Sequence, residues 1–159
     1  MQSTLSRRAV RAASSVSDEE RHARRELAAC YRLADRMGWS DLISAHISHR
    51  VPGEPDHYLI NPYGMLFDEI SASSLIKTDA QGTILSETDY SVNPAVLVIH
   101  AAILEARPDL ACVMHLHTRD GNAVATQKCG LLPATQHALV IYDQVTYHDF
   151  EGPALDPDE

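Results

Sequence analysis

The sequence lacks three features that would place it in common functional classes. It has no long hydrophobic run, since the stretch 95–104 is interrupted by His100 and falls short of the roughly 20 residues that span a bilayer. Its 13 basic residues are outnumbered by 22 acidic ones and form no stripe of Lys or Arg that would attract nucleic acid. Residues 1–17 contain no continuous apolar segment of the kind found in secretory signals. A membrane span, nucleic-acid binding and secretion are therefore not expected.

Cysteine is scarce as well. The three cysteines, Cys30, Cys112 and Cys129, make an odd number without paired spacing, so a disulfide framework is not expected. Reduced thiols are typical of the cytoplasm, where we expect the protein to reside. Cys112 lies three residues before His115 on an apolar run, so it should face away from that histidine and into the core.

The composition suits one globular domain. Of the 159 residues, 45% are hydrophobic and 22% are charged, which is sufficient to bury a core. We expect a flexible tail over residues 1–16 and a single domain over residues 17–159.

Capping signals and hydrophobic periodicity predict alternating helices and strands. Ser17 followed by Glu20 forms a capping box at the start of the first helix. Asn93 and Pro94 start another, because Asn is a good N-cap and Pro lacks only an amide that the first turn does not need. Helices are expected over 17–38, 71–76, 94–106 and 118–128, strands over 43–51, 57–60, 110–116, 137–142 and 145–147, and a hairpin turn over 80–83. This alternation predicts an α/β fold of packed layers, and Asp156 begins one more helix signature.

His115 and His117 are the clearest candidates for chemistry. On a strand, residues two apart project from one face with their Cβ atoms about 7 Å apart, so two imidazoles can converge on one metal ion. The apolar run before them places the pair at the end of a buried strand; a partly exposed structural pair is the alternative interpretation. A catalytic zinc site needs a third protein ligand, for which His100, His137 and His148 are candidates. His100 lies among apolar neighbours, which is more typical of a core histidine.

Four blocks of the sequence resemble the class II aldolase/adducin family. They are 44–52 (SAHISHRVP), 60–75 (INPYGMLFDEISASSL), 92–108 (VNPAVLVIHAAILEARP) and 113–118 (VMHLHT), in the order and spacing of that family. The resemblance implies a three-layer αβα sandwich that assembles as a homo-oligomer. It also implies zinc, held by His115 and His117 with a third histidine from a later block, and a small carbonyl or sugar-phosphate ligand.

The resemblance is incomplete at the family's active-site positions. Gly64 is kept in the turn that approaches phosphate, and His46 stands where the family has an asparagine, so both are expected to contact substrate. Val96 occupies the position of the catalytic glutamate, and a valine cannot transfer a proton. Pro94 and Ala95 replace two phosphate-contacting serines, a pattern that is similar to the adducin-like branch of the family.

Two functional hypotheses follow from these departures. The first is a degenerate or truncated family member with a partial zinc site, because the family's third zinc histidine would follow Asp156 and has no matching position. The domain would then be incomplete at its C-terminal side. The second is a zinc-dependent aldolase or epimerase acting on a small hydroxy-carbonyl or sugar-phosphate compound. In that enzyme His46 or Tyr147 would replace the missing glutamate.

Overall fold

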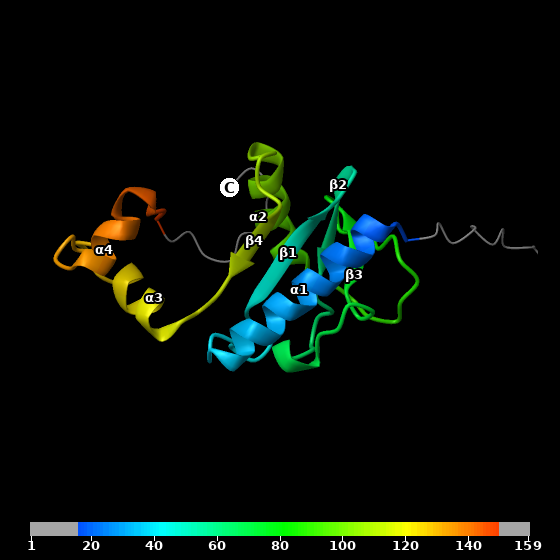
Figure 1. Cartoon of the computed structure of the whole chain (residues 1–159), viewed down its shortest axis with the longest axis horizontal. Helices are drawn as coiled ribbons and strands as arrows, with labels where there is room; N and C mark the ends of the chain where they lie inside the picture. The colour runs from blue at the N-terminus through cyan, green and yellow to red at the C-terminus, as the bar shows by residue number, and fades with distance from the viewer. Residues whose placement is uncertain (1–15, 150–159) are drawn as a thin grey trace, which may run out of the picture.

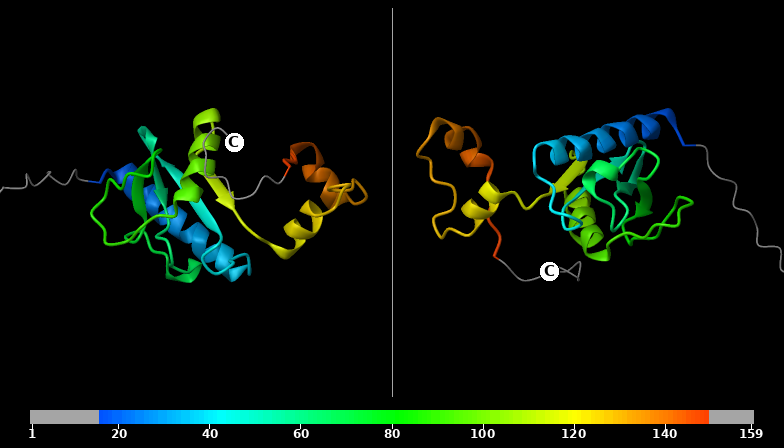
Figure 2. Two further views of the ribbon diagram at one scale, coloured as in Figure 1. Left: turned by 180° about the vertical axis from the view of Figure 1, so that it is seen from behind. Right: turned by 90° about the horizontal axis from the view of Figure 1, so that it is seen from below.

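A four-stranded antiparallel sheet with a helix on each face forms the body of the protein (Figure 1). The computed structural model describes residues 16–149. The strand order is β3-β2-β1-β4. Helix α1 covers one face and α2 the other, which gives the three layers that the family resemblance implies (Figure 2). The elements are α1 (Asp18–Arg36), β1 (His46–Val51), β2 (Glu54–Ile60), the 3₁₀ helix η1 (Phe67–Glu69), β3 (Ile76–Asp79), α2 (Pro94–Ala106), β4 (Cys112–His115), α3 (Arg119–Ala125), α4 (Gln136–Ile141) and the 3₁₀ helix η2 (Tyr142–Gln144).

Helix α1 begins where the capping signal predicts it. The Ser17 Oγ accepts a hydrogen bond from the Glu20 backbone N–H at 3.0 Å. The Glu20 carboxylate binds the Arg24 guanidinium and the Lys77 ammonium, at 2.8 and 3.0 Å, instead of reaching back to the cap. Because Glu20 is buried, its pair with Lys77 joins α1 to β3 inside the protein.

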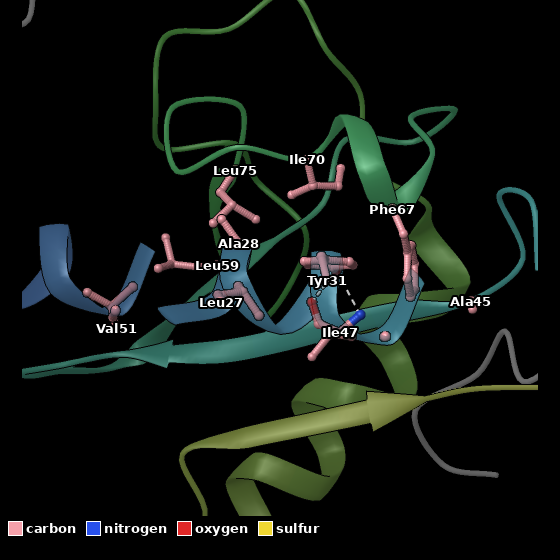
Figure 3. Packing of buried hydrophobic residues seen from close by; sticks show 12 residues of the cluster. Leu27, Ala28, Tyr31, Ala45, Ile47, Val51, Leu59, Phe67, Ile70 and Leu75 are labelled. Carbon is pink, nitrogen blue, oxygen red and sulfur yellow. Dashed lines mark hydrogen bonds between the residues drawn. The ribbon is translucent and has the colours of Figure 1, made fainter. Parts of the chain in front are cut away.

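The largest hydrophobic cluster lies between α1 and the sheet, with Tyr31 at its centre (Figure 3). The Tyr31 ring is fully buried and packs edge-on against Phe67, with their centroids 4.7 Å apart. Its hydroxyl accepts a hydrogen bond from the Ile47 backbone N–H at 2.7 Å and donates one to Asn61 Oδ1 at 2.8 Å. Tyr31 therefore connects α1, β1 and the turn that follows β2.

Strand β1 presents different residues to the two helical layers, as the period of two in its sequence predicts. Ile47 belongs to the cluster beneath α1. Its neighbours on the opposite face contact α2: the Ser48 Oγ lies 2.6 Å from His100 Nδ1, and the Arg50 guanidinium donates to the Leu104 backbone oxygen. The alternation therefore directs Ile47 to the layer of α1, and Ser48 and Arg50 to the layer of α2.

Several predicted elements before α3 differ in the structure. The strand expected over 110–116 shortens to β4 and is not buried, because it forms an edge of the sheet where Met114 is 41% exposed. Strand β1 begins at His46 rather than at residue 43, because residues 42–44 form a turn. The helix expected over 71–76 is a turn at 72–74, and Ile76 enters β3 because it pairs with Ile60 of β2.

The segment after β4 departs furthest from the prediction. Residues 137–142, expected as a strand, fall mainly in helix α4, whose N-cap Thr135 accepts a hydrogen bond from the Ala138 N–H. The strand expected over 145–147 is irregular, and the helix expected over 118–128 ends at Ala125. Helices α3 and α4 lie away from the sheet and contain no buried residue (Figures 1 and 2).

The expected N-terminal tail and the helix signature at Asp156 fall outside the described residues, apart from residue 16. Within residues 16–149, no helix combines the length and the apolar composition needed to cross a membrane.

Candidate metal centre

Four histidines from the sheet and α2 meet near the start of β1 and the end of β4. His46 is the first residue of β1, His100 lies on α2, His115 is the last residue of β4, and His117 follows it by two positions. Ring centroids are 4.6 Å apart from His100 to His46, from His46 to His115 and from His115 to His117. We call these four side chains the histidine cluster.

The register between β1 and β4 brings His46 and His115 together. His46 is the direct antiparallel partner of His115, so both side chains lie on the same face of the sheet. Their rings stack with an interplanar angle of 16°. His100 reaches the same face from α2 and is held by the contact of its Nδ1 with the Ser48 Oγ at 2.6 Å. Strand pairing and helix packing therefore assemble a cluster whose members are up to 71 residues apart, counting from His46 to His117.

His115 and His117 direct their ring nitrogens at each other. The two Nε2 atoms are 2.7 Å apart, and the rings meet edge-on at 84°. At this distance one Nε2 carries a hydrogen and donates it to the lone pair of the other. The Nδ1 of His117 lies 2.9 Å from the Oδ2 of Asp41. The two imidazoles thus converge as their spacing predicts, even though His117 lies beyond the last residue of β4.

His46 and His100 are buried, and each has one ring nitrogen without a partner. They are 9% and 1% exposed. Neither Nε2 makes a hydrogen bond to any residue in the described part of the chain. A buried polar atom left unpaired costs about 1–3 kcal/mol, so such atoms commonly mark the position of a water, an ion or a ligand.

Burial keeps these rings in their neutral form. It lowers the pKa of His46 to about 4 and the pKa of His100 to about 3, with a smaller contribution from repulsion by His115 and by His46, respectively. Burial also lowers the pKa of His115, and repulsion by His117 adds to this effect. Neutral imidazole is the form that binds a metal ion, so His46, His100 and His115 hold available lone pairs near pH 7.

The stability of the protein is expected to fall as the pH drops below the ordinary histidine pKa of 6.5. His46 and His100 take up protons near that pH in the unfolded chain, whereas the folded protein takes them up only near pH 4 and 3. Between these limits the unfolded state binds more protons, which lowers the free energy of unfolding by up to about 1.4 kcal/mol per pH unit for each histidine. Urea unfolding at several pH values from about 7.5 to 5 measures this slope.

The exposed His137 provides the control for this prediction, because the His137→Ala variant should keep the slope of the parent protein. A free energy of unfolding that stays constant from pH 7.5 to 5 would contradict the burial of His46 and His100 as neutral rings.

A small cavity adjoins His46. Its volume is about 10 Å³, which is space for about one water molecule. It is lined by Ile43, His46, Ile60, Asn61, Tyr63, Asn93 and Val96. Val96, at the position that the family resemblance assigns to a catalytic glutamate, therefore lines this cavity with an apolar side chain. Gly64, predicted to contact substrate, is exposed in the adjacent turn with a φ of +91° and is not among the lining residues.

The other candidate residues lie in the segment after β4 or on β4 itself. The Tyr147 hydroxyl accepts a hydrogen bond from the Leu131 N–H, which holds it within that segment. His137 and His148 are exposed there, and neither joins the histidine cluster. Cys112 is exposed at the edge strand, so the expectation that it lies in the core is wrong.

The histidine cluster fits zinc in its donor chemistry. Imidazole nitrogens are common zinc ligands. The Nε2 of His46, whose ring stacks on His115, has no hydrogen-bond partner among the described residues. However, no three His, Cys, Asp or Glu side chains are placed around a single ion position anywhere in residues 16–149. His115 and His117 could therefore supply at most two ligands of a zinc site, which normally has three or four.

Sequence reasoning missed Asp41 and Ser48. Asp41 lies 76 residues before its partner His117, and no local pattern connects the two. Ser48 offered a weak signal, because it follows His46 by two positions and so had to share its face of β1.

Similarities to known proteins lead to one family. A family model described as the Class II Aldolase and Adducin N-terminal domain matches residues 25–157. The chain belongs to the class II aldolase and adducin family. A Caulobacter vibrioides protein named as an aldolase class 2 protein is 53% identical over 144 residues, which are 91% of this chain and 56% of that protein. Mouse alpha-adducin is 48% identical over 142 residues, which are 88% of this chain and 19% of the adducin.

Solved structures of class II aldolase relatives share the fold. An aldolase II superfamily protein from Pseudomonas syringae matches with a TM-score of 0.86 at 52% identity, covering 89% of this chain and 57% of that one. The L-fuculose 1-phosphate aldolase from Glaciozyma antarctica matches with a TM-score of 0.75 at 28% identity, covering 82% and 53%. The α/β fold of the class II aldolase type is thereby confirmed. The chain spans about half the length of the aldolase-type proteins that it matches.

Proposed function

We propose that this class II aldolase/adducin domain binds zinc through His115 and His117 and does not carry out the carboxylate-assisted aldol reaction. The observation that carries the proposal is the convergence of the two Nε2 atoms to 2.7 Å, in a cluster whose His46 shares a cavity with Val96. Two imidazoles directed at one point can both donate lone pairs to a cation once the ring that carries its hydrogen on Nε2 adopts the other tautomer. A valine in place of the glutamate removes the group that would move the proton. This combination describes a degenerate family member with a partial zinc site.

The remaining ligands of the zinc ion would come from chain outside residues 16–149, from a second copy or from water. We propose a homo-oligomer, which is supported by exposed apolar side chains on α4, including Leu139 (59% exposed) and Val140 (69% exposed). A cytoplasmic location is supported by the three free cysteines.

A zinc-dependent lyase for a small hydroxy-carbonyl or sugar-phosphate compound is the second candidate. It is favoured by the buried, unpartnered Nε2 of His46 at the cavity and by the likeness to L-fuculose 1-phosphate aldolase. In this enzyme His46 and Gly64 would contact the substrate, and His46 would replace the glutamate as the proton-transfer group. Zinc, when bound, supplies a Lewis acid that polarises the substrate carbonyl.

Two measurements on the purified protein separate these functions. Metal analysis after dialysis against zinc is expected to show retained zinc, and cleavage of short sugar phosphates is expected to show no rate that a chelator abolishes. Absence of retained zinc would overturn the proposed function. A cleavage rate that is lost with chelator and restored with zinc would instead establish the lyase.

A further inference from the structure

We propose that Asp41 is a positioning residue that fixes the tautomer and the ring orientation of His117 for metal binding. This inference rests on the proposed zinc site. Asp41 lies between α1 and β1, and its Oδ2 contacts the Nδ1 of His117 at 2.9 Å across 76 residues of sequence. The contact joins the loop before the central strand β1 to the second residue after the edge strand β4.

The chemistry of this contact determines which nitrogen of His117 carries the hydrogen. An ionised carboxylate only accepts hydrogen bonds, so the hydrogen must be on Nδ1, which donates it to Asp41. When the His117 ring carries this single hydrogen, its Nε2 is left with a lone pair, and this atom is the one directed at His115. A histidine ligand needs a free lone pair on the nitrogen that meets the metal, and a carboxylate on the other nitrogen is a common way to secure it.

The negative charge of Asp41 acts in the same direction. A cation held by His115 and His117 would be bound by two neutral rings, and the nearby carboxylate would offset part of its charge. The carboxylate also makes the His117 ring more electron-rich through the hydrogen bond, which strengthens it as a ligand.

The backbone beside Asp41 adopts a conformation that is unfavourable for its sequence. Within residues 16–149, Leu42 is the only non-glycine residue with a positive φ, at +47°. Its side chain is 72% exposed, so burial of the leucine does not compensate for this conformation. The Ser44 N–H closes the turn by donating to the Asp41 backbone oxygen at 2.8 Å. The turn therefore keeps a strained residue next to the carboxylate that contacts His117, as expected where strain serves a site.

A surface ion pair without a role in metal binding is the competing explanation. The His117 and Asp41 side chains are 35% and 48% exposed, and exposed pairs of this kind contribute little to stability. Such a pair would leave the zinc affinity unchanged when Asp41 is replaced. The two explanations therefore differ in the metal affinity rather than in the stability of the fold.

The test compares the parent chain with Asp41→Ala, Asp41→Asn and a control. The control, Asp56→Ala, removes an exposed carboxylate near the start of β2. Long-range ¹H–¹⁵N correlation spectra of the metal-free, ¹⁵N-labelled proteins report the tautomer of His117. Competition with a zinc-chelating dye reports the zinc affinity, and thermal unfolding checks that each variant is folded. Asn keeps an oxygen acceptor without the charge, so its zinc affinity should lie between those of the parent and Asp41→Ala.

The expected result is a single Nδ1–H tautomer in the parent chain, a mixture of tautomers in Asp41→Ala, and a 10–100-fold weaker zinc affinity in that variant, while Asp56→Ala matches the parent. Unchanged zinc affinity in Asp41→Ala would overturn the inference. If the parent chain binds no zinc, the proposed function fails, and the tautomer then decides the positioning role separately. Loss of the Nδ1–H form in Asp41→Ala supports that role, and a tautomer that does not depend on Asp41 overturns it.

Discussion

Replacing His117 with alanine is expected to lower the affinity for zinc by more than about 100-fold, because loss of a direct ligand should exceed the 10–100-fold effect of losing an outer partner. His115→Ala should have a similar effect, since its Nε2 is the atom that faces the Nε2 of His117. The double variant should add little to either single loss, because one imidazole cannot hold the ion alone. Competition with a zinc-chelating dye measures all three affinities.

His137→Ala is the matched control for these variants. His137 is an exposed histidine on α4 outside the histidine cluster, so its removal should leave the zinc affinity unchanged. Equal affinities in the parent, His115→Ala and His117→Ala would exclude both residues as ligands. A similar loss in His137→Ala would place the zinc on the segment after β4 instead.

The largest loss of stability is expected for Tyr31→Ala, at about 3–5 kcal/mol, because the change removes a fully buried aromatic ring. Tyr31→Phe keeps the ring and removes the hydroxyl from the Ile47 N–H and from Asn61. Leaving those buried groups unpaired should cost about 1–3 kcal/mol. Urea unfolding measures both differences.

Tyr90→Phe serves as the control for Tyr31→Phe, because the same change is made at a tyrosine that is 49% exposed. The difference between the two Phe variants then reports the buried hydrogen bonds. Equal stabilities for Tyr31→Phe and Tyr90→Phe would contradict the role assigned to the Tyr31 hydroxyl. Since Asn61 also lines the cavity beside His46, the Tyr31 contact connects the core to the candidate site.

Local chemistry was sufficient to predict the elements near the start and the middle of the chain. The Ser17 hydroxyl caps α1, Pro94 is the first residue of α2, and the alternation in β1 separates Ile47 from Ser48. The edge position of β4 could not be predicted, because an apolar run does not reveal how many neighbours a strand has. The sequence of α4 predicts a strand because a short apolar run fits both a strand and a helix. The N-cap at Thr135 is the local signal that indicates a helix.

The candidate site was predictable only where its residues are close in sequence. The spacing of His115 and His117 is enough to place two imidazoles near each other. The contribution of His46 depends on its register opposite His115, and that of Asp41 depends on a turn 76 residues before His117. Such contacts are set by strand pairing and loop placement, which no local pattern encodes.

The most direct test of the zinc site is an anomalous difference map at the zinc absorption edge, from crystals of the zinc-loaded protein. We expect one peak about 2.0–2.1 Å from the Nε2 atoms of both His115 and His117. The two nitrogens should then be farther apart than the 2.7 Å of their direct contact, because a tetrahedral ion holds its ligands roughly 3.4 Å from each other. A peak elsewhere, or an intact contact between the two rings with no peak beside them, would contradict the proposed zinc site.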